Sequence, residues 1–119
     1  MRSLVVKVTA GAEAAERCNQ GFTVAAAAVA AGASVSLWLT GEAAWFGVPG
    51  KAEEFALPLA TPLADLRDVV LAGGRVTVCT QCAERRGITA DDLLEGVRIA
   101  GAAAFAEEIL SDQVQALVY

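Results

Sequence analysis

Strand-like and helix-like patterns alternate along this chain, and that alternation is the feature that most constrains its fold. Short apolar runs rich in β-branched residues occupy residues 4–9, 35–40, 75–80, 97–99 and 114–118. Helical patterns occupy residues 13–31, 61–74 and 101–110. Strands that alternate with helices are typical of a parallel sheet covered by helices. The sequence therefore predicts an α/β fold, formed by a single domain over residues 1–119.

Glycine and proline mark the ends of two of the predicted helices. Gly32 lies where the first helix should stop, in the position that favours a left-handed residue. Thr61 followed by Pro62 predicts an N-cap and a first helical residue. Gly73 and Gly74 then end that second helix. These signals fix the helices that flank the second and third strands.

The remaining connections carry weaker signals. Residues 41–60 contain two prolines, Trp45 and Phe46, and we expect a loop with one helical turn. These aromatic side chains are expected to be covered by a neighbouring subunit, because a small domain has little room to bury such a segment. Thr89 and Asp92 have the spacing of a capping box at the beginning of a short helical turn.

Charge and composition exclude several functions. The net charge is −5, and the chain has no basic stripe, so we expect no nucleic-acid partner. The chain has no histidine, which removes Ser-His and Cys-His catalysis and the commonest metal ligand. Three cysteines alone do not fill a tetrahedral zinc site, although a site completed by Asp, Glu or another subunit stays open. We therefore expect no metal and no cofactor.

Cysteine usage and the apolar runs predict the compartment. Three cysteines, an odd number, fit a reducing cytoplasm better than a secreted disulfide framework. Lys7 interrupts the N-terminal apolar run, so this run predicts a strand and not a signal peptide. The alanine-rich stretch at residues 22–33 is shorter than the roughly 20 residues that span a bilayer. The expectation is a soluble cytoplasmic protein that does not enter membranes.

Two cysteines mark the candidate site. A β-branched run leads directly into Cys79 and Cys82, and Arg85 and Arg86 follow within a few residues. Guanidinium groups and the unpaired N–H groups at a helix start both favour a thiolate, which is the reactive form of cysteine. The alternative is that two small apolar side chains end a buried strand. The spacing also suits a reversible dithiol–disulfide pair.

Other candidate residues follow from the geometry of parallel sheets. Ligands bind at the carboxyl ends of the strands, so the loops after the first three strands are expected to share one rim with Cys79. The rim candidates from these loops and from the first helix are Asn19, Thr40, Glu42, Trp45 and Gln81. Cys18 lies on the apolar face of the first helix, which favours a packed core thiol, with an approach to the same rim as the alternative.

With these features in place, the chain resembles the DsrE/DsrF-like family of small sulfur-relay proteins, which includes YchN-like and TusD-like branches. The resemblance covers the whole length. Its most specific part is the cysteine-containing strand end that runs into Arg-Arg-Gly-Ile at residues 85–88. The stretch Glu-Gly-Val-Arg-Ile-Ala-Gly-Ala-Ala at residues 95–103 and the apolar strand at residues 114–119 also fit.

The resemblance implies a flavodoxin-like three-layer α/β/α domain with about five mostly parallel strands, assembled as a trimer or hexamer. It also implies an intracellular sulfur carrier or sulfurtransferase that holds sulfur as a persulfide on Cys79, with a sulfur donor or acceptor protein as partner. Cys82 matches a second cysteine found in some branches. Two other functions stay open: a non-catalytic oligomeric module that binds a small ligand or a protein, and a thiol–disulfide redox sensor.

Overall fold

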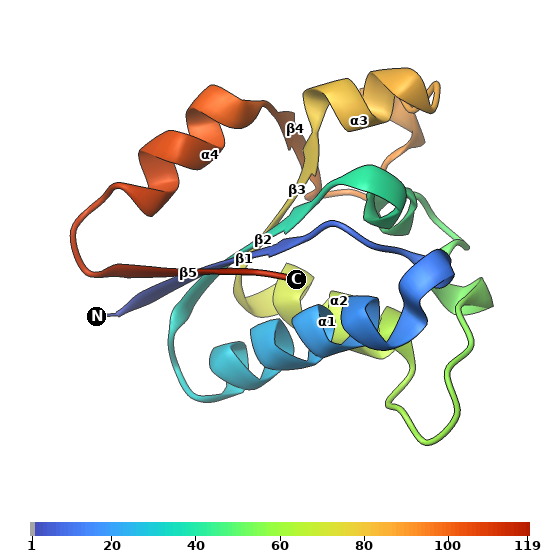
Figure 1. The fold of residues 1–119 in the computed structure, drawn as a ribbon, viewed down its shortest axis with the longest axis horizontal. Helices are drawn as coiled ribbons and strands as arrows, with labels where there is room; N and C mark the ends of the chain where they lie inside the picture. Colours follow the sequence, from blue (N-terminus) through green and yellow to red (C-terminus); the bar gives the residue numbers. More distant parts are fainter. Residues whose placement is uncertain (1) are drawn as a thin grey trace.

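A computed structural model describes residues 2–119, which form a five-stranded sheet between two layers of helices (Figure 1). All the strand pairs are parallel, and the strand order is β4-β3-β2-β1-β5. The strands are β1 (Ser3–Val8), β2 (Ser34–Leu39), β3 (Arg75–Cys79), β4 (Arg98–Ala100) and β5 (Val114–Val118). The predicted three-layer α/β/α fold is confirmed.

Helices α1 and α2 cover one face of the sheet and α4 lies on the other, whereas α3 follows the carboxyl end of β3 and packs its Cys82 and Ala83 into the core on the side of α1 and α2 (Figure 1). The α-helices are α1 (Ala15–Ala30), α2 (Leu63–Gly73), α3 (Thr80–Arg85) and α4 (Ala102–Ile109). Short 3-10 helices are η1 (Ala12–Ala14), η2 (Gly41–Gly47), η3 (Ala52–Glu54) and η4 (Ala90–Asp92). Within residues 2–119, no helix has the length and apolar character needed to cross a membrane.

The face under α1 and α2 holds the hydrophobic core. Every second residue of the three central strands points into this layer and meets the apolar sides of both helices. Its buried members include Val6, Val8, Leu37, Leu39, Val76, Val78, Cys18, Phe22, Ala25 and Val70. Burial of a large aliphatic side chain is worth about 1.5–3 kcal/mol, so this layer supplies much of the stability of the fold.

The opposite face of the same strands is polar. Lys7 pairs with Trp38, Trp38 with Thr77, and Thr77 with Arg98, so these four residues form one row across the sheet. Trp38 and Thr77 are buried, together with Ser36 on the same side of β2. The layer beneath α4 is therefore built from hydrogen bonds and charges as well as apolar contacts.

The second helix begins one residue later than Thr61 and Pro62 predict. Pro62 has extended backbone angles, φ −51° and ψ 133°, and the helix starts at Leu63. The carbonyl of Pro62 accepts hydrogen bonds from the N–H groups of Asp65 and Leu66, so Pro62 is the N-cap and Thr61 is not. A proline can occupy either position because its fixed φ suits both.

Two other end signals are confirmed. Gly32 follows α1 with φ +91°, in the left-handed region that glycine adopts without strain. Thr89 and Asp92 form the capping box at the beginning of η4, and the N–H of Thr89 donates to Asp92 at 2.8 Å. The first helical pattern, expected from residue 13, instead opens with the 3-10 turn η1 before α1 begins.

The segment at residues 41–60 is more ordered than predicted. It contains two 3-10 helices, η2 and η3, where one helical turn was expected. The expectation that Phe46 needs a neighbouring subunit to cover it is wrong, because its side chain is only 5% exposed. The ring of Phe46 packs edge-on against Phe22 and Phe55, with centroids 6.0 and 5.6 Å apart. Helix η2 folds back onto the core and buries this ring within the chain.

The carboxyl ends of all five strands lie at one edge of the sheet, as the parallel pairing requires. The loops after β1, β2 and β3 therefore share one rim, as predicted. The strand order reverses between β1 and β5, so the topological switch point lies two strands away from β3. Cys79 ends β3 and is at the rim, but not at the switch point itself.

Candidate functional site

Cys79 is the last residue of β3 and the N-cap of α3. Val76 and Val78 point into the apolar core, and the alternation of the strand directs Thr77 and Cys79 to the opposite face. The backbone of Cys79 stays extended, with φ −65° and ψ 131°, and the helix begins with the next residue. The thiol is only partly buried. Cys79 thus presents a reachable sulfur where a strand meets a helix.

Opposing influences act on the pKa of the Cys79 thiol, and together they lower it. Partial burial disfavours the charged thiolate and acts to raise the pKa. Hydrogen bonds from the amide and thiol of Cys82 and from the amide of Gln81 act in the other direction, as does the positive charge of Lys7. Because the thiolate is the nucleophile, these contacts favour the nucleophilic form of Cys79.

Cys82 lies within α3 and is 9% exposed. Its sulfur accepts a hydrogen bond from the backbone N–H of Gly41, 3.2 Å away. Since that contact uses a lone pair of the sulfur, the S–H of Cys82 stays free to donate, and the Cys82 thiol acts to lower the pKa of Cys79. All three cysteines of the chain are free thiols. Cys79 and Cys82 are therefore neighbouring free thiols that do not form a disulfide.

Gly41 is required for this arrangement by its conformation and by its surroundings. Its φ is +55°, and a Cβ atom at this position would lie 2.5 Å from the carbonyl oxygen of Thr9. This oxygen belongs to the backbone just after β1, which cannot move aside as a flexible side chain can. The close approach of the two loops is what brings the Gly41 amide to the Cys82 sulfur.

The two arginines after the cysteines do not form the charged surroundings that the sequence predicts. Arg86 donates through Nε to Glu42 at 2.8 Å and through Nη1 to the carbonyl of Cys82 at 3.0 Å. Its charge is therefore balanced by a carboxylate. Arg85 is exposed in the last turn of α3. Arg86 and Glu42 join the loop after β2 to the cysteine turn, which is a structural role beside the site.

Cys18 is a core residue. It is fully buried in the layer beneath α1, and burial together with the negative charge of Glu13 raises its pKa to about 12. At neutral pH this thiol stays protonated. The structure thus agrees with the packed core thiol that the first helix favours, and does not bring Cys18 to the rim.

The predicted rim residues with uncharged polar side chains, Gln81, Thr40 and Asn19, lie in different places. Gln81 is exposed, and its backbone amide acts to lower the pKa of Cys79. Thr40 is buried next to Gly41 and donates its hydroxyl to a main-chain carbonyl of β1. Asn19 accepts a hydrogen bond from Thr23 and faces the loop at residues 57–60. Of these three residues, only Gln81 contacts the cysteine pair.

Trp45 borders a separate pocket of about 320 Å³. The described residues that line it are Ala12, Glu13, Glu42, Trp45, Phe46, Lys51, Glu54 and Phe55. The ammonium group of Lys51 lies 5.6 Å from the centre of the Trp45 ring. Glu42 belongs both to this pocket and to the ion pair with Arg86, so it stands between the pocket and the cysteine turn.

Lys7 is the site residue that sequence reasoning missed. In the sequence, Lys7 stands out only as the charge that interrupts the first apolar run. A strand that is paired on both sides and covered on both faces is typically apolar throughout, so a single lysine within it is a signal in its own right. In the structure, the charge of Lys7 acts on Cys79 from β1.

The fold and the site together define a small parallel α/β/α protein with two interacting free thiols at the carboxyl edge of its sheet. The chain belongs to the DsrE/DsrF-like family, whose sequence profile matches residues 2–116. The resemblance expected from the cysteine turn and the flanking segments is thereby confirmed at the level of the family.

Solved structures show the same fold. The YchN protein from E. coli superimposes with a TM-score of 0.83 at 20% sequence identity, with complete coverage of both chains. The protein MTH1491 from Methanobacterium thermoautotrophicum, described as of unknown function, gives a TM-score of 0.71 at 14% identity, also with complete coverage. At these identities the similarity establishes the architecture.

A curated relative is more similar in sequence. The uncharacterized protein MJ0760 from Methanocaldococcus jannaschii is 33% identical over 98 residues, which cover 82% of this chain and 36% of that protein. The chain therefore spans about a third of the length of the curated relative it matches.

We expect iodoacetamide to label Cys79 before Cys18 in the folded protein. The pKa of Cys79 is lowered, so its rate should reach half its maximum below pH 9.0, whereas Cys18, with a pKa of about 12, stays a protonated and buried thiol. Peptide mapping after timed quenching across pH measures both rates. Labelling in denaturant, where both thiols should react alike, is the control, and equal labelling in the folded state would contradict the assignment.

Gly41→Ala should destabilise the protein more than Gly50→Ala. Both glycines have positive φ, but a Cβ atom meets the Thr9 carbonyl at Gly41 and open space at Gly50. We expect a loss of about 1–2 kcal/mol at position 50, from backbone strain alone, and a larger loss at position 41. Urea unfolding gives both values. Equal losses would mean that the loop after β2 can retreat from β1.

Proposed function

We propose that this protein carries sulfur as a persulfide on Cys79. The observation that supports the proposal is the Cys79 thiol itself, which is partly buried, has a lowered pKa and lies at the edge of a parallel sheet, three residues before a second free thiol. Membership in the DsrE/DsrF-like family supports the same function. The reaction is a transfer of sulfur between thiols, and the proposed partners are proteins that donate or accept it.

Loading requires a donor persulfide and no redox reagent. The Cys79 thiolate attacks the outer sulfur of a donor R–S–SH, so that a new S–S bond forms to Cys79, the S–S bond of the donor breaks, and R–S⁻ leaves as a thiolate. Cys79 then bears the transferred sulfur as Cys–S–SH or its anion. The amides of Gln81 and Cys82 that favour the thiolate are placed to favour negative charge at this point.

Release can follow two balanced routes. An acceptor thiolate can attack the outer sulfur of the persulfide, which regenerates the Cys79 thiolate and leaves the acceptor as a persulfide. Alternatively, the thiolate of Cys82 can attack the inner sulfur, which expels hydrosulfide and leaves a Cys79–Cys82 disulfide for an external thiol to reduce. The influence of the Cys82 thiol on the pKa of Cys79 supports Cys82 as the accessory group of the second route.

The position of the two free thiols in one turn also favours a second candidate function, a redox sensor. In that case a mild oxidant joins Cys79 and Cys82 by removing two hydrogen atoms, and no sulfur is gained. A protein that binds a small ligand or a partner without thiol chemistry would undergo neither change. The mass of the intact protein after each treatment therefore separates the three functions.

We further propose that the protein assembles as a trimer or a hexamer. Strand β5 is an edge strand that pairs only with β1. The unpaired N–H and C=O groups of an edge strand favour pairing with another chain or coverage by it. Its Leu117 and Val118 are 40% and 65% exposed, and Leu110 in the preceding turn is 81% exposed. Coverage of these apolar side chains by other copies of the chain would remove them from water.

The variant Cys79→Ser should lose all persulfide loading, whereas Cys82→Ser should load but release its sulfur more slowly to a reducing thiol. The reason is that only Cys79 is both reachable and biased toward the thiolate, while Cys82 acts as the attacking group in release. Intact mass after treatment with a persulfide donor measures one gained sulfur. Cys18→Ser is the matched control and should behave as the wild type. If Cys82→Ser alone blocks loading, the two roles are exchanged.

Light scattering over a dilution series should give the mass of a trimer or hexamer, because the exposed apolar residues of β5 and of the turn before it need coverage. A protein that is monomeric at every concentration would contradict the assembly. So would an isologous dimer, which is the commonest state of soluble homo-oligomers.

A further inference from the structure

The polar layer beneath α4 is organised around one carboxylate. Glu108 accepts hydrogen bonds from the hydroxyl of Ser36 at 2.7 Å and from the indole N–H of Trp38 at 3.2 Å. Arg98 forms an ion pair with it, and Arg75 approaches it at 3.7 Å. Burial alone would raise the pKa of Glu108, but these donors and charges hold it below its usual range.

Helix α4 depends on this carboxylate for its position. Among the described residues of α4, none is fully buried, so apolar burial contributes little to docking the helix on the sheet. Phe105 supplies the main apolar contact, with its ring edge-on to Trp38 at a centroid distance of 5.3 Å. The contacts of Glu108 and Phe105 thus fix α4 over β1 and β2.

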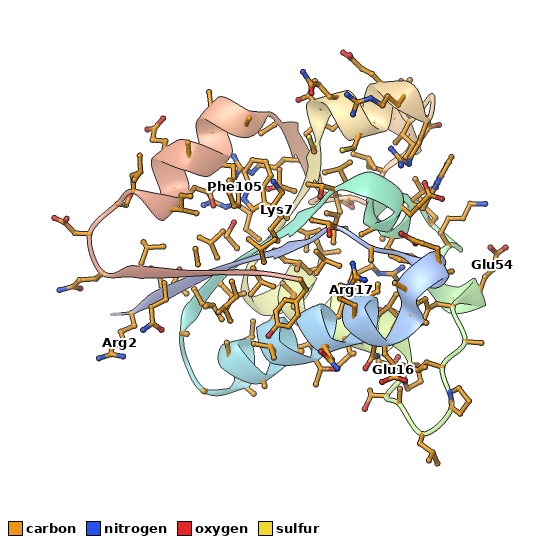
Figure 2. All side chains as sticks on the ribbon, in the orientation of Figure 1. Arg2, Lys7, Glu16, Arg17, Glu54 and Phe105 are labelled. Carbon is orange, nitrogen blue, oxygen red and sulfur yellow. The ribbon has the colours of Figure 1, made fainter. Side chains whose placement is uncertain are left out.

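Phe105 also meets Lys7. The ammonium group of Lys7 lies 4.8 Å from the centre of the Phe105 ring, and Figure 2 shows the two labelled side chains together between the sheet and α4. A cation over an aromatic face is attracted by the ring quadrupole, which holds it without neutralising its charge. Within residues 2–119, Lys7 forms no ion pair with a carboxylate.

The basic side chains near this face of the sheet therefore differ in whether a carboxylate faces them. Arg75 and Arg98 both face Glu108, and Arg86 faces Glu42. Lys7 projects from the same face as Cys79, in the row that contains Thr77, two residues before Cys79 on β3. Unlike these three arginines, Lys7 has no carboxylate partner among residues 2–119.

We propose that Lys7 is the positioning cation of the Cys79 site, held by Phe105 so that its ammonium group stabilises the anion on Cys79, first the thiolate and then the outer sulfur of the persulfide. The persulfide part of this inference rests on the proposed function. The thiolate part does not, because it concerns the free thiol.

The role of Lys7 can be separated from simple structural support by a pH profile. In Lys7→Met, the rate of Cys79 alkylation should reach half its maximum at higher pH than in the wild type. Below that pH the rate should fall by roughly three- to tenfold, the effect of one unit charge at several ångströms in a partly solvated site. Lys7→Arg keeps the charge and should restore the wild-type profile.

Lys51→Met is the matched control, because it removes the other lysine of the chain from a position over Trp45, away from the cysteines. Its profile should equal that of the wild type. Lys7→Gln, which keeps a hydrogen-bonding side chain of similar length, provides a second neutral variant if Lys7→Met does not fold. Phe105→Leu should shift the profile in the same direction as Lys7→Met, by a smaller amount.

The outcomes are distinct. An unchanged profile in the folded neutral variants, or an Arg variant that shifts as far as the Met variant, would overturn the role of the Lys7 charge. An unchanged profile in Phe105→Leu would overturn the part assigned to α4. If the wild type takes up no sulfur from a persulfide donor while the alkylation profiles shift as expected, the proposed function fails and the electrostatic role of Lys7 stands.

Discussion

Parallel pairing between β2 and β3 is the interaction on which the rest of the site depends. Leu39 lies opposite Val78, so the two strands end together and the segments that follow them begin side by side. For this reason the N–H of Gly41, just beyond β2, reaches the sulfur of Cys82, just beyond β3. A slip of one residue would exchange the two faces of β3 and turn Cys79 toward the apolar core.

The two faces of the sheet have different tasks. The layer under α1 and α2 is nearly all apolar, and its burial supplies stability at little risk from unpaired polar groups. The layer under α4 buries Ser36, Trp38 and Thr77, which would destabilise the protein if their polar atoms lacked partners. Glu108 supplies partners to the first two, and Arg98 donates to Thr77. The stability supplied by the apolar layer offsets the cost of burying polar groups and charges in the layer beneath α4, beside Cys79.

Sequence reasoning succeeded where the signal is local. The strand at residues 114–118, the left-handed Gly32 and the position of Cys79 at the end of a strand all follow from short-range patterns. It failed where contacts between distant segments decide. The burial of Phe46 depends on rings from α1 and from the loop near η3, and the ion pair of Arg86 depends on a carboxylate from another loop. Neither contact leaves a trace in local periodicity.

The charge that acts on Cys79 also illustrates why nearness in sequence is a poor guide to electrostatics. Arg86 is close to the cysteines along the chain, but its ion pair with Glu42 weakens its field at any third group. Lys7 belongs to the first strand and has no carboxylate partner among residues 2–119. Partial burial opposes the thiolate, whereas the amide and thiol of Cys82, the amide of Gln81 and, to a smaller extent, the charge of Lys7 favour it, so that together they lower the pKa of Cys79. A thiol that must accept sulfur and give it up again needs that balance, because the thiolate is the attacking group when sulfur is loaded and the leaving group when it is passed on.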